Sequence, residues 1–222
     1  GAKIDVYDGA TLLGQTLAGA DGAWTFLTSE LLDGNHNFLF KATDLAGNTS
    51  QASKPLSVQV DTAVDAPVIL AVSPDRGVAG DLHTNAKVLA LSGTSEAFSK
   101  VFIYSGETLI GTALANAAGV WSLRTPSLAD GQYSFTAEAI DRAGNISDTS
   151  SPATVTVDTV APNRPSIDYF SPDEGVVGDG KTNATTLTLG GRADAFDKVT
   201  LYDGKTVIGS VVTDENGLWT YT

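Results

Sequence analysis

The sequence contains no cysteine and no methionine, and only two of its 222 residues are histidine. The absence of cysteine excludes disulfides and thiolate-bound metals, so the chain must be stabilised by core packing, to which oxygen-bound cations could add. No apolar run approaches the roughly 20 residues of a membrane-spanning helix, so we expect no membrane insertion. Because it has neither an initial methionine nor a signal peptide, the chain is interpreted as an internal piece of a longer protein.

Basic residues are also scarce, with 13 Lys and Arg against 26 Asp and Glu, a formal net charge of −13. This balance argues against nucleic acid as a partner, because phosphate recognition needs a basic surface. It also disfavours binding to an anionic membrane. Of the 26 acids, 20 are Asp and 6 are Glu. Aspartate forms turns and is also the short carboxylate of calcium-binding loops, so both uses are considered below.

A unit of about 97 residues is repeated along the chain. The segment AKIDVYDGATLLG at 2–14 returns as SKVFIYSGETLIG at 99–111 and as DKVTLYDGKTVIG at 197–209. Trp24, Trp121 and Trp219 each follow a Gly-containing turn, 97 and then 98 residues apart, and we expect them to be core or half-buried residues. The sequence therefore predicts three repeats: residues 1–61 (strands C to G), 62–158 (complete) and 159–222 (strands A to E).

Short runs of alternating polarity, separated by turn signals, predict strands throughout the complete repeat. Seven such strands in about 97 residues indicate an all-β protein built from tandem immunoglobulin-like sandwiches in an elongated array. Tyr133, after the turn at 128–131, is predicted to form a tyrosine corner, which His36 would alter in the first repeat. The predicted strands are A 68–72, B 88–92, C 100–104, C′ 108–114, E 120–124, F 132–140 and G 153–157.

Catalytic constellations are not found in the sequence. His36 and His83 stand at unrelated positions of different repeats, and no nucleophile elbow, zincin, Walker or dinucleotide motif occurs. The three N-x-S/T triplets, which begin at Asn48, Asn145 and Asn183, are short enough to arise by chance. We therefore expect a protein that is not an enzyme.

Two long, oxygen-rich loops stand out: SPDRGVAGDLHTN at 73–85 and SPDEGVVGDGKTN at 171–183. In an immunoglobulin-like sandwich the A–B loop lies at the end where strand G leaves, so the first loop is expected to face the next repeat. Carboxylates that converge at this junction would repel one another unless a cation neutralises them, and Ca²⁺ accepts six to eight oxygens in irregular geometry. The predicted ligands at this junction are Asp75, Asp81, Asn85, Asp130, Asp158 and Asp194, with Asp173, Asp179 and Asn183 in the equivalent loop of the last repeat.

A second set of oxygen ligands is predicted where the first repeat meets the second. It consists of Asp33 from the E–F turn, Asp61 from the linker, and Asp141 and Asn145 from the F–G loop of the next repeat. The alternative is that D-x-A-G-N at 141–145 is simply a stable turn, since Gly and Asn accept positive φ, and that Asp61 only ends a strand.

Several motifs resemble one known family. Y-D-G-x-T-x-I-G, D-x-x-G-x-W, L-x-D-G-x-Y, D-x-A-G-N-x-S and V-D-T-x-x-P resemble the bacterial Ig-like repeats of giant adhesins, secreted by the type I (RTX-type) route. The resemblance implies an extracellular stalk on the bacterial surface, whose neighbouring repeats are stiffened by interdomain Ca²⁺ and which supports adhesion and biofilm formation. Host or surface ligands would then bind other parts of the parent protein. The linker proline departs from the V-D-T-x-x-P motif in the first repeat, because Pro67 lies further from the preceding V-D-T than Pro162 does.

Two functions of different kind follow from these observations. The first is a non-catalytic extender segment of a surface adhesin. The alternative is a carbohydrate- or protein-binding module of a surface protein or secreted hydrolase, which predicts an exposed aromatic patch at Phe102 or at Tyr169 and Phe170. Because the first and last repeats are predicted to be partial sandwiches, we also expect exposed strand edges and head-to-tail pairing between molecules.

Overall fold

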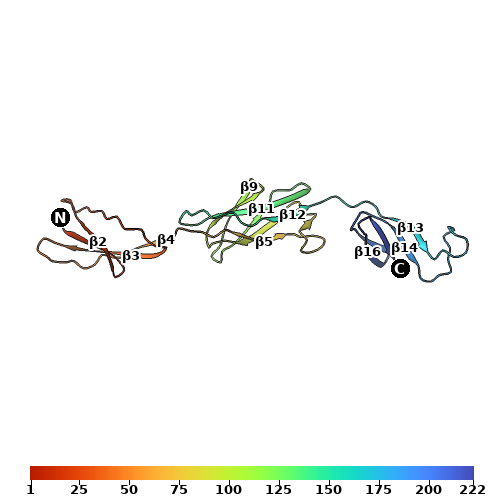
Figure 1. Cartoon of the computed structure of the whole chain (residues 1–222), viewed down its shortest axis with the longest axis horizontal. Helices are drawn as coiled ribbons and strands as arrows, with labels where there is room; N and C mark the ends of the chain where they lie inside the picture. Colours follow the sequence, from red (N-terminus) through yellow and green to blue (C-terminus); the bar gives the residue numbers. More distant parts are fainter. The chain divides into compact units, whose positions relative to one another are not determined.

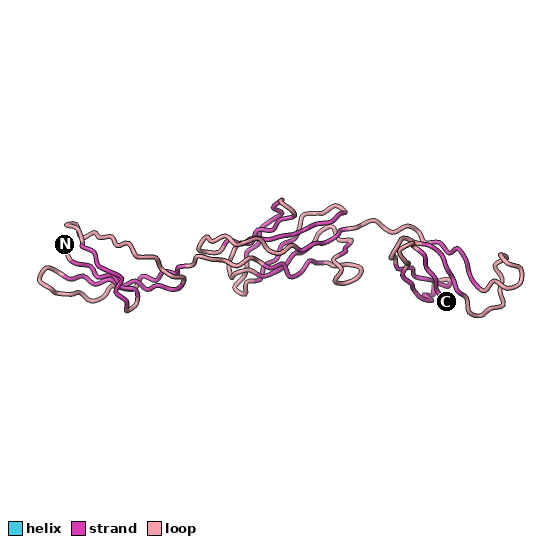
Figure 2. Tube along the Cα trace, in the orientation of Figure 1, coloured by secondary structure: helices cyan, strands magenta, loops and turns pink.

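The computed structural model describes residues 1–222, which form seventeen β-strands and no helix (Figures 1 and 2). The chain has no helix that is long and apolar enough to cross a membrane. It divides into two compact units, residues 1–158 and 159–222, which are described separately.

Residues 1–61 contribute a four-stranded antiparallel sheet in the order β2-β1-β3-β4. One face of the sheet is apolar and buries Val6 and Phe38, while the ring of Trp24 is half-buried with its centroid 4.9 Å from that of Phe40. Residues 18–33, which include Trp24, form no strand. The four strands are β1 (Lys3–Asp8), β2 (Thr11–Leu17), β3 (Gly34–Thr43) and β4 (Leu56–Val60).

Residues 62–158 form a complete two-sheet sandwich. A three-stranded sheet, β10-β7-β5, packs against a five-stranded sheet, β6-β12-β11-β8-β9. Trp121, Leu89 and Leu91 meet Ile103 and Phe135 in the core between the sheets, and all five side chains are fully buried. The strands are β5 (Val68–Ser73), β6 (His83–Thr84), β7 (Ala90–Thr94), β8 (Lys100–Ser105), β9 (Thr108–Leu114), β10 (Val120–Arg124), β11 (Gly131–Ile140) and β12 (Ala153–Val157).

The predicted strands of this repeat agree with the structure, with one shift and one omission. Strand B begins at Ala90 rather than at Val88, because the backbone of Leu89 bonds to Thr125 instead of to a neighbouring strand. The two-residue strand β6 has no sequence signal of its own. It exists because it pairs in parallel with β12, His83 beside Thr156. The predicted inward side of strand F, Phe135, Ala137 and Ala139, is completely buried. The fold class is therefore as predicted.

The glycine of the T-x-x-G motif is explained by a close approach between strands. A Cβ atom at Gly111 in β9 would lie 2.9 Å from the side chain of Leu123 in β10. At Gly14 in the first repeat, the neighbour would be the ring of Phe26 at 2.8 Å. Any larger residue here would separate strand C′ from the side chain that covers it.

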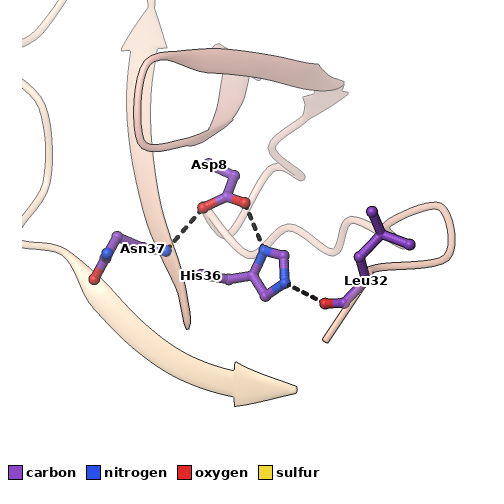
Figure 3. Close-up of polar contacts among 4 residues, drawn as sticks. All are labelled: Asp8, Leu32, His36 and Asn37. Atoms are coloured by element: carbon purple, nitrogen blue, oxygen red, sulfur yellow. Dashed lines mark hydrogen bonds and ion pairs between the residues drawn. The ribbon is translucent and has the colours of Figure 1, made fainter. Parts of the chain in front are cut away.

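The predicted tyrosine corner is present, since the hydroxyl of Tyr133 donates to the backbone oxygen of Ala129 at 3.0 Å. His36 occupies the same place in the first repeat, and its Nε2 lies 2.9 Å from the backbone oxygen of Leu32 (Figure 3). Both side chains thus bond to the carbonyl four residues earlier. The histidine therefore keeps the corner but changes its chemistry, because its other ring nitrogen, Nδ1, contacts Asp8.

Residues 159–222 form a three-stranded sheet, β13-β14-β17, and a two-stranded hairpin, β15-β16. Their smaller core consists of Val199, Leu201 and Trp219. Strand β15 pairs only with β16, whereas its counterpart β8 pairs with both β9 and β11. Head-to-tail pairing through such edges stays a prediction. The strands are β13 (Ser166–Ser171), β14 (Thr188–Arg192), β15 (Lys198–Asp203), β16 (Thr206–Val212) and β17 (Leu218–Tyr221).

Candidate metal centre

Three carboxylates from separate segments converge within the unit 1–158. Asp61 follows β4, Glu96 lies in the turn between β7 and β8, and Asp141 follows β11. One carboxylate oxygen from each lies within 4.8 Å of the other two. Asp141 is buried, Asp61 is half-buried and Glu96 is exposed. The group, called the junction cluster below, joins the end of the first repeat to two loops of the second.

Asp141 is held in place by a turn that it caps itself. Its Oδ1 accepts hydrogen bonds from the backbone N–H groups of Gly144 (2.7 Å) and Asn145 (2.8 Å), and Oδ2 accepts one from Asn145 Nδ2 (2.7 Å). Burial raises the pKa of Asp141, but these bonds outweigh it and hold the pKa below the usual value. The same turn occurs at Asp44, where Asn48 Nδ2 donates to Asp44 Oδ2 at 2.9 Å. D-x-A-G-N is therefore a turn in both repeats.

Asn145 gives this turn a second role, because it reaches across to the linker. Its Nδ2 also donates to the backbone oxygen of Asp61 at 3.0 Å. One side-chain amide thus contacts both Asp141 and Asp61, which ties the F–G loop of the second repeat to the end of the first. The turn and the ligand interpretations of this motif are compatible with each other.

The repulsion among these carboxylates is seen in the pKa of Glu96. Loss of hydration raises its pKa, and the negative charges of Asp61, Asp141 and Asp65 raise it further. A raised pKa means that the ionised carboxylate is disfavoured where it stands. The junction cluster is thus a site where added positive charge would be stabilising.

A hollow of about 310 Å³ lies beside the junction cluster and includes Asp61 and Glu96 in its wall. The guanidinium of Arg142 also lines it and stacks on the ring of Phe98, 4.3 Å from the centroid. Phe98 has a φ of 64°, in the left-handed region that bulky residues seldom adopt, and Phe196 repeats this at 65°. The two B–C turns therefore share this backbone conformation at the aromatic residue.

The donor atoms of the junction cluster fit a hard divalent cation. All are oxygens, and a Ca²⁺ ion bound at 2.3–2.6 Å allows two of its ligands to stand up to about 5 Å apart. Each pair of these oxygens lies within 4.8 Å, which is inside that limit. Zinc sites in proteins usually include Cys or His ligands, which the cluster lacks.

The structure brings together three of the four residues predicted for this junction, Asp61, Asp141 and Asn145. Asp33 has a different partner, because its Oδ2 accepts a hydrogen bond from Thr62 Oγ1 at 3.1 Å. Glu96 was missed. The internal repeat contained the signal, since Glu96 stands 98 residues before Asp194, which was predicted as a ligand from the same B–C turn of the next repeat.

The long A–B loop is organised around Asp75. Its Oδ2 accepts a hydrogen bond from the backbone N–H of Gly80 at 2.6 Å, while its Oδ1 is buried without a donor. Asp173 repeats both features, with Gly178 as the donor at 2.7 Å. A buried carboxylate oxygen that has no donor is costly unless a cation or water satisfies it. Both loops therefore keep one oxygen available for a ligand.

The other predicted ligands of this loop lie at the same end of the sandwich. Asp81 Oδ1 accepts from the backbone N–H of His83 at 2.9 Å, and Asp179 repeats this with Lys181. The pairing of β6 with β12 lets Asp158 donate its N–H to the oxygen of Thr84, next to Asn85. Asp130 lies one position beyond the pair Gly131–Val157, alongside Asp158. In the last loop, Asn183 stands at the position of Asn85.

Asp194 has a partner within the unit 159–222. Its Oδ2 accepts the backbone N–H of Asn163 at 2.8 Å and its Oδ1 accepts Asn163 Nδ2 at 3.0 Å. These two bonds lower its pKa. In the preceding repeat the corresponding pair is Glu96 and Asp65, which repel each other. The ionised carboxylate is therefore disfavoured at Glu96 and favoured at Asp194, so the two B–C turns differ in their electrostatics.

The aromatic residues of the alternative function take part in packing. The ring of Phe102 is half-buried, with Lys100 Nζ 5.0 Å from its centroid. Tyr169 places its ring over Gly190, where a Cβ atom would overlap it. Tyr169 nevertheless remains 49% exposed, and Phe170 beside it is half-buried.

The two-sheet sandwich, the strand order and the tyrosine corner define an immunoglobulin-like β-sandwich protein. The model of the bacterial Ig-like domain family matches residues 1–62 and 63–159, and the chain belongs to this family. No curated protein sequence matches the chain.

Solved structures resemble the chain at low overall similarity. One is a tetra-tandem repeat from the extending region of a large adhesion protein, with 23% identity and a TM-score of 0.38 over 99% of this chain and 57% of that one. Another is a 1.5-MDa bacterial ice-binding adhesin (18%, TM-score 0.41, 99% of this chain and 74% of that one). A third is a Ca²⁺-stabilised ice-binding adhesin of an Antarctic bacterium (22%, TM-score 0.35, 99% and 56%). The chain thus spans little more than half of the first and third.

Proposed function

We propose that the chain is a non-catalytic extender segment of a bacterial cell-surface adhesin, in which Ca²⁺ at the repeat junctions stiffens successive Ig-like repeats. The observation that carries this proposal is the junction cluster, where Asp61, Glu96 and Asp141 approach one another within 4.8 Å at the boundary between two repeats. A cation bound there would hold the linker of one repeat against two loops of the next.

The rest of the proposal concerns context. We propose three repeats, residues 1–61, 62–158 and 159–222, in an extracellular stalk secreted by the type I route. The stalk would support adhesion and biofilm formation, while other parts of the parent protein bind the host or surface ligand. The motifs D-x-A-G-N-x-S and V-D-T-x-x-P, together with membership of the bacterial Ig-like family, support this assignment.

The A–B loops are proposed as further calcium positions. Asp75 and Asp173 each keep a buried oxygen without a donor. Asp81, Asn85, Asp130 and Asp158 lie at the same end of the complete repeat, and Asp179 and Asn183 repeat the loop positions. Asp33, which accepts a hydrogen bond from Thr62, and Asp194, which accepts two from Asn163, complete the proposed set. The two loops would then bind cations independently of the junction cluster.

Calcium titration of the whole chain tests the proposal. Extracellular modules bind with dissociation constants on the order of 10⁻⁴–10⁻³ M, so 10 mM Ca²⁺ should stabilise one site by about 1.4 to 2.7 kcal/mol. We expect a higher Tm and a longer particle in small-angle scattering with Ca²⁺ than with EDTA. Asp61→Asn should reduce both responses, whereas Asp148→Asn, at an exposed aspartate of the second repeat, should not. An identical Tm and scattering profile in Ca²⁺ and EDTA would contradict the proposal.

A further inference from the structure

Each repeat ends one of its sheets with the same kind of strand. Strand β9 is the outermost strand of the five-stranded sheet and pairs on one side only, with β8. Strand β2 occupies the same edge of the first sheet, and β16 is paired only with β15. The outward backbone N–H and C=O groups of all three strands therefore have no strand partner. Such an edge is a template for pairing with another chain.

These edge strands lack the usual protection against pairing. Proteins commonly place Lys or Pro on exposed edges to prevent association. The three strands read TLLGQTL, TLIGTAL and TVIGSVV, with no charged residue and no proline, although 18% of the chain is charged. A β-bulge interrupts β9 only near the hairpin turn, so residues 111–114 remain in regular register with β8.

Two apolar side chains are exposed at the ends of each edge strand. In β9 they are Leu109 and Leu114, which are 49% and 68% exposed. A single exposed leucine needs no explanation, but here the same two positions are apolar and exposed in all three repeats. The equivalent pairs are Leu12 with Leu17 and Val207 with Val212.

The two ends of the β8–β9 hairpin have opposite charges, so they complement those of a second copy that lies antiparallel to it. Lys100 opens β8 beside Leu114, and Glu107 precedes Leu109 at the turn. An antiparallel second copy places the lysine end of one hairpin against the acidic end of the other, and each Leu109 beside a Leu114. A parallel copy would oppose like charges instead. The other two repeats keep the lysine, as Lys3 and Lys198, but have Ala10 and Lys205 at the position of Glu107, so this charge complementarity belongs to the hairpin of the complete repeat.

We propose that this edge, β9 and its counterparts β2 and β16, is a homotypic docking surface that binds the same edge of a second copy of the chain, antiparallel, by β-strand addition. Elsewhere the net charge of −13 opposes the approach of two copies. The edge strands add no charge of their own to that repulsion and present backbone hydrogen-bonding groups without a strand partner. Lateral association of neighbouring molecules is the consequence.

Cysteine cross-linking tests the proposed geometry directly, because the chain contains no other cysteine. Thr112 is exposed at the middle of β9, so Thr112→Cys would stand close to its copy across an antiparallel pair, within disulfide reach. Ser127→Cys, in an exposed turn of the same repeat, is the matched control. Under mild oxidation we expect the Thr112→Cys dimer to form at least about tenfold faster. Equal rates for the two variants would overturn the proposal.

Sedimentation velocity over a range of concentrations tests whether the chain dimerises through these strands. Gln15→Lys, Thr112→Lys and Ser210→Lys together place one lysine on each edge strand at an exposed position. Ser29→Lys, Ser127→Lys and Thr185→Lys add the same charge in loops. We expect wild type and the loop variant to dimerise alike, and the edge variant to bind at least about tenfold more weakly at an unchanged Tm. A wild type that stays monomeric, or an edge variant that dimerises as wild type does, would refute homotypic docking here.

Discussion

The Oδ2 atom of Asp8 lies 2.6 Å from Nδ1 of His36, and this contact converts the tyrosine corner of the first repeat into an ionic one (Figure 3). The opposite ring nitrogen faces the backbone oxygen of Leu32, so both nitrogens of His36 face acceptors. This geometry favours the doubly protonated imidazolium. Asp8 is fixed in turn by the backbone N–H of Asn37, which donates to its Oδ1 at 2.8 Å.

The first prediction concerns the pH dependence of this corner. The hydrogen bond to Leu32 and then the one to Asp8 raise the pKa of His36, so its stabilising effect is present below about pH 6.5 and disappears as the pH rises through the folded value. The bonds to His36 and then Asn37 lower the pKa of Asp8, so its effect is present above about pH 4 and disappears as the pH falls through its folded value. The first repeat should be most stable between these limits.

Thermal unfolding from pH 4 to 9, combined with NMR titration of the His36 ring, measures this window. The double substitution Asp8→Ser with His36→Tyr installs the residues that the second repeat has at these positions, Ser105 and Tyr133. We expect the variant to lose the decline in Tm above pH 6.5. A His36 ring that titrates at or below pH 6.5 would contradict the interpretation.

Much of the fold was predictable from the sequence because the same strand alternation and turn motifs occur in each repeat. Alternation of side chains located β8 to β12, and the L-x-D-G-x-Y motif located the corner at Tyr133. Errors occur where the backbone bonds to something other than a strand. Leu89 is fully buried yet lies outside β7, because its N–H bonds to Thr125 Oγ1.

The candidate site was harder to predict than the fold. Asp61 and Asp141 were found from topology, since a linker and an F–G loop meet at the same end of a sandwich. Glu96 was not, because ligand residues were sought mainly among aspartates. Its proximity to Asp61 depends on how the first repeat packs on the second, which no local pattern encodes. Likewise, only the packed loop reveals that Asp75 has one buried oxygen without a donor.

The second prediction measures the corner hydrogen bond of the complete repeat. Tyr133→Phe removes the hydroxyl that donates to Ala129 and leaves the ring in place, so the unfolding free energy should fall by about 1 kcal/mol. Tyr104→Phe, on β8 of the same repeat, is the matched control and should change it by less than about half as much. Urea unfolding of both variants makes the comparison. Equal effects would show that the corner bond contributes nothing specific.

The third prediction concerns Gly93 on β7. A Cβ atom there would overlap the backbone oxygen of Val68 and would lie 2.7 Å from the Trp121 ring. Since a backbone atom and a buried ring both obstruct it, Gly93→Ala should destabilise the repeat by at least about 2 kcal/mol. The exposed control Ser122→Ala on β10 should cost well under 1 kcal/mol. Thermal unfolding with calorimetry separates the two, and a near-neutral Gly93→Ala would mean that β5 and β7 shift apart without cost.

The fourth prediction uses Glu96 to separate charge repulsion from ion binding. Loss of hydration and the charges of Asp61, Asp141 and Asp65 raise its pKa, so the ionised side chain weakens folding as the pH rises through that value. Without calcium at pH 7, Glu96→Gln should therefore raise the Tm. With 10 mM Ca²⁺ the same substitution removes a proposed ligand, so the variant should gain less stability than wild type. The difference between the two Tm values should then shrink or change sign.

Glu107→Gln, an exposed glutamate at the β8–β9 turn, is the matched control and should leave both Tm values and their calcium shift unchanged. Only a site where carboxylates repel in the absence of an ion and bind it when present produces opposite effects of one substitution in EDTA and in calcium. If Glu96→Gln raised the Tm by the same amount in both buffers, the cluster would be a site of repulsion alone. Any calcium that stiffens the segment would then have to bind elsewhere, with the A–B loop around Asp75 as the next position to test.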